Sequence, residues 1–129
     1  MKWMTIAAML ICVGGCHVST NDDHTLVSND AVDIGPGDCV IVEGPFSLPS
    51  GASNDYTIND HGNGDAMEVT IVDDTFASCD FSAGYGTDTT VGSFSGGTGS
   101  VPAGYYDFVV ACDNAVDDCQ FNLTWSANY

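Results

Sequence analysis

Two runs near the end of the chain carry an apolar residue at every second position, and each run has a cysteine at the end nearer the other. The first run covers residues 105–112 and ends in Cys112, and the second covers 119–126 and begins at Cys119. Side chains two residues apart share one face of a strand, so both cysteines are predicted to face the core. If residues 113–118 form a hairpin loop, Cys112 lies opposite Cys119 and the further cross-strand pairs on that face are apolar. The spacing therefore predicts an antiparallel hairpin closed by a disulfide.

The six cysteines divide by position along the chain. Two lie in the first sixteen residues and four in the acidic remainder. Once Cys112 and Cys119 are paired, Cys39 and Cys79 remain for a second disulfide, which joins an early strand to the middle of the domain. Zinc is the competing use of these cysteines, but the chain has no C-x2-C pair and the ligand spacings do not fit.

Short runs rich in β-branched and aromatic residues recur after residue 38, separated by Gly, Pro, Asn and Asp clusters. No stretch after residue 16 has the apolar period of an amphipathic helix. Many short strands with frequent turns predict an all-β fold, a small antiparallel β-sandwich with two disulfides over residues 39–129. Residues 92–104, rich in Gly and Ser, are expected to connect two strands. About seven candidate strands are indicated: 39–43, 55–58, 67–72, 76–81, 90–94, 105–112 and 119–126.

The first fifteen residues differ in kind from the rest of the chain. Lys2 is followed by an apolar or small stretch over residues 3–13, and the first acidic residue is Asp22. This is the layout of an export signal. A helix over the stretch would rise only about 16 Å, too little to cross a bilayer core of about 30 Å.

The sequence Val-Gly-Gly-Cys at residues 13–16 resembles the lipobox of bacterial lipoproteins, with Val13 where that family most often has Leu. The resemblance implies that residues 1–15 are a removed signal peptide. It also implies that Cys16 becomes a lipidated first residue, with acyl chains such as palmitate holding the protein on a membrane. His17 is not the Asp that retains such lipoproteins at the inner membrane, so an outer-membrane or cell-surface location is implied. The alternative is an ordinary signal peptide followed by a chance cysteine.

Residues 16–38 are polar and acidic, and they show no hydrophobic periodicity. This composition is typical of a flexible linker. We expect the lipidated N-terminus and a disordered tether here, with the domain beginning at Cys39.

The closing segments 101–110 (VPAGYYDFVV) and 119–125 (CQFNLTW) resemble the final hairpin of bacterial pre-peptidase C-terminal domains. Those domains are small secreted β-sandwiches, usually appended to proteases. The resemblance covers the last quarter to half of the chain and implies a sandwich fold. Function has to be argued from a site, because one fold hosts many functions.

The chain holds 18 acidic residues and a single basic one, Lys2, which lies in the predicted signal peptide. Nucleic-acid binding needs Lys or Arg at the phosphates and is therefore excluded, as is docking of a basic patch on anionic lipid. Unpaired carboxylates repel one another in a compact state, so salt or divalent cations are expected to stabilise the fold. Solubility in a saline habitat is an equally open explanation of the acidity.

The segment 59–65 combines carboxylates, amides and glycines in one turn. Asp60, Asn63 and Asp65 supply oxygen donors of the kind that Ca²⁺ prefers, and Ca²⁺ is the cofactor that the sequence brings into question. The segment lacks the closing bidentate glutamate of an EF-hand. The competing interpretation is an Asx and glycine turn between two strands. The acidic loop 113–118 carries the same two alternatives.

Nucleophilic catalysis needs a base beside a serine or cysteine, and His61 is the one histidine inside the predicted domain. Nothing like G-x-S-x-G accompanies it, so we expect His61 to be a solvent-facing turn residue and the chain not to be an enzyme. A small secreted hydrolase would require a cleft joining His61 to a serine or carboxylate. Carboxylate pairs for glycoside hydrolysis stay open, but Glu43 and Glu68 fit solvent-side strand positions equally well.

Tyr105 falls on the strand face opposite the core and is the best candidate for an exposed aromatic ring that stacks on a sugar. The leading hypothesis is a non-catalytic, lipid-anchored surface module with a structural or adhesive role, open to stabilisation by Ca²⁺. Its partner would be a surface protein or a polysaccharide. The alternative is a carbohydrate-binding surface lipoprotein that uses Tyr105.

Overall fold

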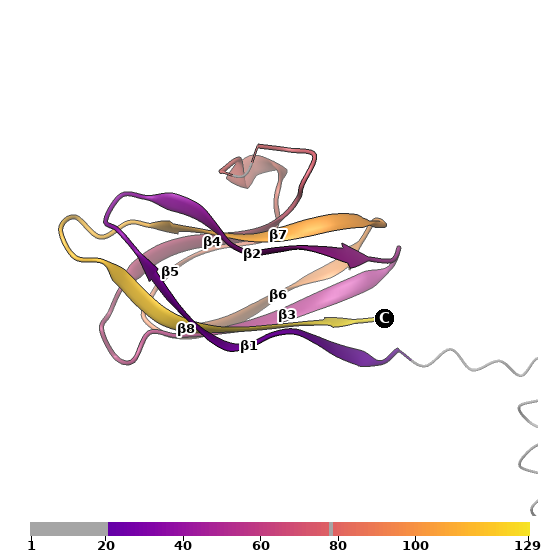
Figure 1. Cartoon of the computed structure of the whole chain (residues 1–129), viewed down its shortest axis with the longest axis horizontal. Helices are drawn as coiled ribbons and strands as arrows, with labels where there is room; N and C mark the ends of the chain where they lie inside the picture. Colours follow the sequence, from indigo (N-terminus) through magenta and orange to yellow (C-terminus); the bar gives the residue numbers. More distant parts are fainter. Residues whose placement is uncertain (1–20, 78) are drawn as a thin grey trace, which may run out of the picture.

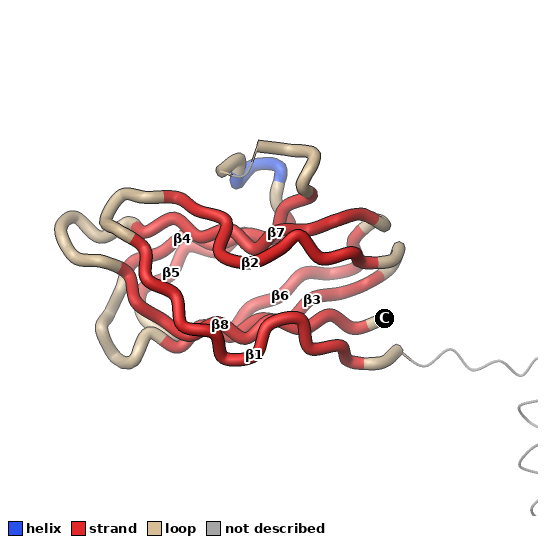
Figure 2. Tube along the Cα trace, viewed as in Figure 1, coloured by secondary structure: helices blue, strands red, loops and turns tan. Residues whose placement is uncertain are grey.

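The computed structural model describes residues 21–77 and 79–129, so the predicted signal peptide and Cys16 lie outside the described part. Eight strands build two four-stranded antiparallel sheets packed face to face (Figure 1; Figure 2). The predicted all-β sandwich with two disulfides is confirmed. No helix within the described residues is long and apolar enough to cross a membrane. The elements are β1 (Asp23–Ile34), β2 (Cys39–Leu48), β3 (Ala52–Asn59), β4 (Ala66–Asp73), the 3-10 turn η1 (Phe81–Ala83), β5 (Tyr85–Val91), β6 (Phe94–Val101), β7 (Gly104–Cys112) and β8 (Cys119–Asn128).

One sheet has the strand order β1-β8-β3-β6 and the other β2-β7-β4-β5, and their inner faces share one core. Along β8, buried residues alternate with more exposed ones, as expected of a strand with one face in the core and the other in water. The centre of the core is aromatic. The ring centroid of Phe108 lies 5.0 Å from that of Tyr56 and 5.5 Å from that of Trp125, which stabilises the contact between the sheets.

β7 is buried on both faces, unlike β8. Its inner residues Tyr106 and Phe108 lie in the core, and its outer residues Asp107 and Val109 are buried as well. Figure 1 shows the segment after β4, which includes η1, lying over the outer face of this sheet. Because this segment covers the outer face of β7, residues on both faces of the strand are buried, and the sequence at its centre is almost continuously apolar.

The predicted hairpin between β7 and β8 is wrong, although the disulfide inferred from it is present. β7 pairs with β2 and β4, whereas β8 pairs with β1 and β3, so the two strands belong to different sheets. Both strands turn an apolar face toward the same core from opposite sides. Alternation identifies the inner face of a strand but does not identify the strand beside it.

Both predicted disulfide pairings are confirmed. Cys112–Cys119 joins the two sheets at one end of the sandwich, with a Cα–Cα distance of 5.7 Å and both residues buried. Cys39–Cys79 links the start of β2 to the segment after β4 across 40 residues. The second disulfide therefore ties that segment to the sheet that it covers, and its longer loop constrains the unfolded chain more.

β1 occupies much of the region predicted to be a disordered tether, so that prediction is wrong from residue 23 onward. β1 pairs with β8, and its residues Val27 and Ile34 are buried in the core. Two register shifts and the positive φ of Asn29 interrupt β1, so its inner residues do not follow a period of two. The domain begins at Asp23 rather than at Cys39.

Three further predictions of strand position are wrong. Residues 76–81 contain no strand in their described part, and residues 90–94 span the turn between β5 and β6. Residues 92–104, predicted to be a connection, include the whole of β6. Glycine is depleted in strands, which concealed β6. A Cβ at Gly96 would lie 2.6 Å from the Tyr56 hydroxyl oxygen, so this glycine allows β6 to pass close to the Tyr56 ring.

Candidate functional site

Three loops meet at the end of the sandwich opposite the point where the chain enters the domain (Figure 1). They cover residues 35–38, 60–65 and 113–118. The register between β1 and β8 fixes this arrangement, because Ile34 at the end of β1 pairs with Cys119 at the start of β8. We call this end the loop end.

The Asp60 carboxylate accepts hydrogen bonds from the backbone of its own loop, the loop after β3. Asp60 is 1% exposed, and its Oδ1 accepts hydrogen bonds from the Gly62 N–H at 3.0 Å and the Ser93 hydroxyl at 2.9 Å. Its Oδ2 accepts from the N–H groups of Gly64 at 2.7 Å and Asp65 at 3.1 Å, which fills the carboxylate's acceptor sites. Burial alone would raise the pKa of Asp60, but the hydrogen bonds from Ser93 and from the backbone outweigh it and lower that pKa below its usual range.

Asp65 and Asn114 join the loop after β3 to the loop after β7. The Asn114 amide nitrogen donates to Asp65 Oδ1 at 2.9 Å, and its oxygen accepts from the Ala66 N–H at 2.9 Å. The second oxygen of Asp65 accepts from the Gln120 backbone N–H at 3.0 Å. The two acidic loops that the sequence left separate thus form one structure. Beside them lies a pocket of about 400 Å³ lined by Asn63, Asp65, Asp117, Asp118 and Gln120.

Asp118 lies at the acidic rim of this pocket. The charge of Asp33 on β1, together with slight burial and a hydrogen bond with Asp33, raises the pKa of Asp118. The charges of Asp117 and Asp38 act in the same direction. Carboxylates of the β1 end and of the loops 35–38 and 113–118 therefore act on one another electrostatically, and no Lys or Arg occurs among residues 21–129 to offset them.

The structure gives the three predicted calcium ligands different surroundings. Asp60 has its acceptor sites filled by protein donors, whereas Asn63 and Asp65 line the pocket. In the part of the chain that the structure describes, no three His, Cys, Asp or Glu side chains come together in a group that could hold a metal ion. The arrangement of Asp60 instead matches the competing interpretation, an Asx and glycine turn.

Stabilisation by Ca²⁺ stays a prediction with a direct test. If the domain binds Ca²⁺ only when folded, adding the ion raises the midpoint of thermal unfolding by several degrees and a chelator reverses the rise. The measurement is a thermal melt with 1 to 5 mM CaCl₂ or EDTA at constant ionic strength. An unchanged midpoint contradicts a structural site.

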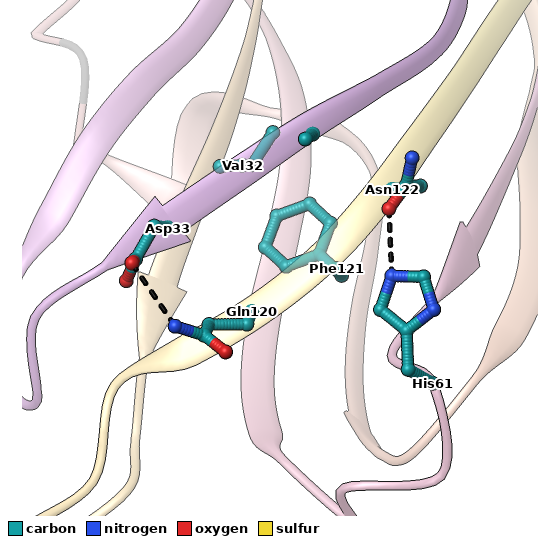
Figure 3. Close-up of a pocket in the computed structure, with 7 residues that line it drawn as sticks. Val32, Asp33, His61, Gln120, Phe121 and Asn122 are labelled. Carbon is teal, nitrogen blue, oxygen red and sulfur yellow. Dashed lines mark hydrogen bonds between the residues drawn. The ribbon is translucent and has the colours of Figure 1, made fainter.

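His61 stands beside a second pocket on the outer side of β1 and β8 (Figure 3). Its Nε2 lies 2.6 Å from the Asn122 side-chain oxygen, and the Asn122 amide nitrogen donates to the Asn29 carbonyl at 2.9 Å. The Gln120 amide nitrogen donates to Asp33 Oδ2 at 3.1 Å. The pocket measures about 290 Å³, and its lining also includes the apolar residues Ala31, Val32 and Phe121.

The hydrolase alternative requires His61 to contact a serine hydroxyl or a carboxylate. His61 is instead on an exposed turn, as predicted, with its backbone N–H donating to the Asn59 side-chain oxygen at 3.0 Å. Its ring contacts the neutral amide of Asn122. An amide is neither a nucleophile nor a titrating partner that could activate the imidazole, so these contacts favour a positioning or binding role for His61.

Tyr105 lies on the other sheet, away from the His61 pocket. It is 56% exposed on the outer face of β7, whereas Tyr106 beside it is buried in the core and donates its hydroxyl to the Pro102 carbonyl at 2.6 Å. Alternation along the strand therefore placed both tyrosines correctly. The structure does not bring Tyr105 and His61 into one site, so they are separate candidates for ligand binding.

No family model matches the chain, and no curated protein matches its sequence. Among solved structures, the carbohydrate-binding module of lichenase 5A from Cellvibrio mixtus, in complex with cellotriose, aligns over 86% of this chain and 88% of its own. The TM-score is 0.45 at 15% sequence identity. The acid-stable capsid of the Helicobacter pylori bacteriophage KHP30 aligns over 84% of this chain and 91% of its own, with a TM-score of 0.37 at 13% identity. Alignments at this level establish neither a shared site nor a shared function.

Two carboxyl groups away from the loop end are also perturbed. A hydrogen bond with Asp30, followed by burial and the charge of Asp30, raises the pKa of Glu43. Burial, followed by the charge of Asp74, raises the pKa of Asp107. Asp107 is 5% exposed, and its Oδ1 has no hydrogen-bond partner among the described residues. Glu43, for which a solvent-side strand position and a catalytic carboxylate pair were both open, is partly buried beside another acid.

The residues that form the His61 pocket were mostly missed by the sequence analysis. Gln120 and Asn122 alternate with the core residues of β8, and this signal was sufficient to place them on the outer face. Asp33 had been assigned to the tether. Their convergence on His61 depends on the pairing of β1 with β8, which alternation does not reveal.

Proposed function

We propose that this chain is an exported, lipid-anchored surface module with a structural or adhesive role and without catalytic activity. The observation that supports export is the pair of disulfides, because such bonds form and persist in oxidising compartments outside the cytosol. The lipobox-like Val-Gly-Gly-Cys at residues 13–16 supports the anchor. The contacts of His61 with amides support a binding role over a catalytic one.

The position of β1 limits how far an anchored domain could stand from the membrane. If Cys16 carries the lipid, the tether is residues 17–22, because β1 begins at Asp23. Six residues reach at most about 20 Å when fully extended. β1 then runs away from the anchor toward the loop end, so the loop end and both pockets would point away from the lipid surface.

The anchor is tested by replacing Cys16 with serine in the full chain expressed in a bacterial host. Labelling by a radioactive or clickable palmitate analogue should disappear, and the protein should leave the membrane fraction, because no acyl chain then holds it. The double variant Cys112→Ser/Cys119→Ser is the control and should keep its label. Membrane retention of Cys16→Ser, or native protein that still carries Lys2 and an unmodified Cys16, contradicts the proposal.

Carbohydrate binding is the second candidate function, and the exposure of Tyr105 favours it. A half-exposed ring on a rigid central strand offers flat apolar area at low entropic cost. Tyr105→Ala should weaken binding to an insoluble polysaccharide at least tenfold in a pull-down assay. Val116→Ala is the matched control, because Val116 is 80% exposed in the loop after β7 and should leave binding unchanged. Equal binding by wild type and Tyr105→Ala contradicts a role for this ring.

A further inference from the structure

His61 has an unusual backbone conformation for a residue with a side chain. Its φ is 60°, in the left-handed region that glycine adopts without strain, and the glycines at 62 and 64 also have positive φ. The loop places an imidazole at this position although glycine would fit the turn more easily. His is one of the few residue types with a side chain that adopt this region, and its position at the border of a pocket makes the imidazole a candidate for ligand binding.

The pocket beside His61 is lined by both polar and apolar residues. The described hydrogen bonds use His61 Nε2, the Gln120 amide nitrogen and both side-chain groups of Asn122. His61 Nδ1 and the Gln120 side-chain oxygen are left for a ligand. Ala31 and Val32 also line the pocket and add apolar surface. Hydroxyl groups both donate and accept hydrogen bonds, and the carbon faces of a sugar ring are apolar, so a sugar matches both halves of this lining.

The charges around the pocket and its volume restrict the class of ligand further. Asp33 lines the pocket, Asp118 is close enough for the charge of Asp33 to raise its pKa, and the domain has neither Lys nor Arg to hold an anion. Phosphorylated, sulfated and uronic-acid ligands are therefore repelled. A volume of about 290 Å³ is at the lower limit for small-molecule sites, which suits a single sugar residue rather than a longer segment.

We propose that the pocket formed by His61, Gln120 and Asn122 binds the terminal residue of a neutral, hydroxyl-rich glycan. This inference rests on the binding role proposed above and names its site and ligand class. His61 Nδ1 and the Gln120 side-chain oxygen bond the sugar hydroxyls, and Asn122, on the outer face of β8, holds the His61 ring in position. Because the pocket lies at the loop end, an anchored domain would hold it away from the membrane.

The test is a titration of the folded domain, residues 21–129, followed by two-dimensional NMR. The probes are neutral gluco-, manno- and xylo-oligosaccharides, with oligogalacturonate and chitosan oligomers as anionic and cationic counterparts. We expect at least one neutral probe to bind and to shift the signals of His61, Gln120 and Asn122, and the anionic probe not to bind. His61→Gly should weaken that binding at least tenfold while leaving the unfolding midpoint unchanged or higher, because glycine relieves the positive φ.

Gln120→Ala is the second variant, and Tyr105→Ala is the control that should keep full affinity for this pocket. Binding that survives His61→Gly but is lost in Tyr105→Ala overturns this site and leaves the second candidate function standing. Absence of binding by every neutral probe, or tighter binding of chitosan oligomers, overturns the ligand class. None of these outcomes affects the anchor, which the Cys16→Ser experiment tests separately.

Discussion

Replacing Asp60 with alanine is expected to destabilise the domain by about 3 to 5 kcal/mol, the range of the most damaging single substitutions. The reason lies in the hydrogen bonds that the Asp60 side chain accepts. Asp60 is almost completely buried, and its two oxygens accept hydrogen bonds from three backbone N–H groups and one hydroxyl. The Asp65 N–H is buried and the other three donors are partly buried. A fully buried donor left without an acceptor costs about 1 to 3 kcal/mol and a partly buried one less, and alanine removes all of the acceptors at once.

Urea unfolding followed by tryptophan fluorescence measures the loss, since Trp125 is in the core. Asp60→Asn should fall between wild type and alanine, because an amide keeps one acceptor oxygen and loses the other. Asp113→Ala is the control: Asp113 is an exposed acid of the neighbouring loop, and its loss should change stability by no more than about 0.5 kcal/mol. An Asp60→Ala variant within 1 kcal/mol of wild type would mean that water replaces the carboxylate and that the loop does not depend on it.

The role of Asp60 illustrates what the sequence could and could not predict. The composition of residues 59–65 predicts either a cation site or an Asx turn, and both use the same residue types. The choice depends on whether the carboxylate points toward solvent or toward its own loop. The conformation that decides this needs positive φ at Gly62 and Gly64 and a hydroxyl from Ser93 on the β5–β6 turn. Ser93 is distant in sequence, so local pattern could not supply that information.

The sequence was sufficient to predict the fold class and both disulfide pairings. It was not sufficient to predict which strands lie side by side. Alternation showed that Cys112 and Cys119 both face the core, which was sufficient to pair them even though their strands lie in different sheets. The same reasoning failed for β1, whose bulges at Asn29 and before Val27 break the period of two. It failed for β6 because glycine carries no hydrophobic signal and because close contact with the Tyr56 side chain requires it. Strand partners are set by long-range packing, which a single sequence does not encode locally.

The second large expected effect is that of pH on stability. Mild acidification is expected to stabilise the domain, whereas in ordinary acid denaturation a fall in pH destabilises a protein. All 18 acidic residues lie within the described part of the chain, and the single Lys or Arg of the whole sequence is Lys2, so carboxylates there have no basic partner other than histidine. Lowering the pH from 7 to about 4.5, where the carboxyl groups begin to take up protons, is expected to raise the unfolding midpoint by several degrees. Protonation reduces the mutual repulsion that the compact state concentrates. Added NaCl at pH 7 should reproduce part of the rise by screening.

The direction of this pH dependence follows from the pKa shifts of individual carboxyl groups. The folded-state pKa values of Glu43 and Asp107 are raised above 4.5 and 3.8, so their ionisation opposes folding at neutral pH. That penalty is relieved as the pH falls through the folded pKa of each group, and it is gone below the unfolded value. Asp60 acts in the opposite direction, because its pKa is lowered, and its contribution is lost only when the pH falls below 3.8 toward the folded value. Stability should therefore peak at about pH 4 to 5 and decline on either side.

The double variant Glu43→Gln/Asp107→Asn separates these two groups from the general repulsion. It removes the titrating groups while keeping their shape, so its midpoint at pH 7 should exceed that of wild type, and its gain on acidification should be smaller. Asp55→Asn is the control, because Asp55 is exposed on the outer face of β3, and it should follow the wild-type profile. Thermal melts between pH 3 and 8 at fixed ionic strength give all three curves. A wild-type midpoint that falls steadily from pH 7 to about pH 4.5 would show that carboxylate repulsion does not control the stability of this sandwich.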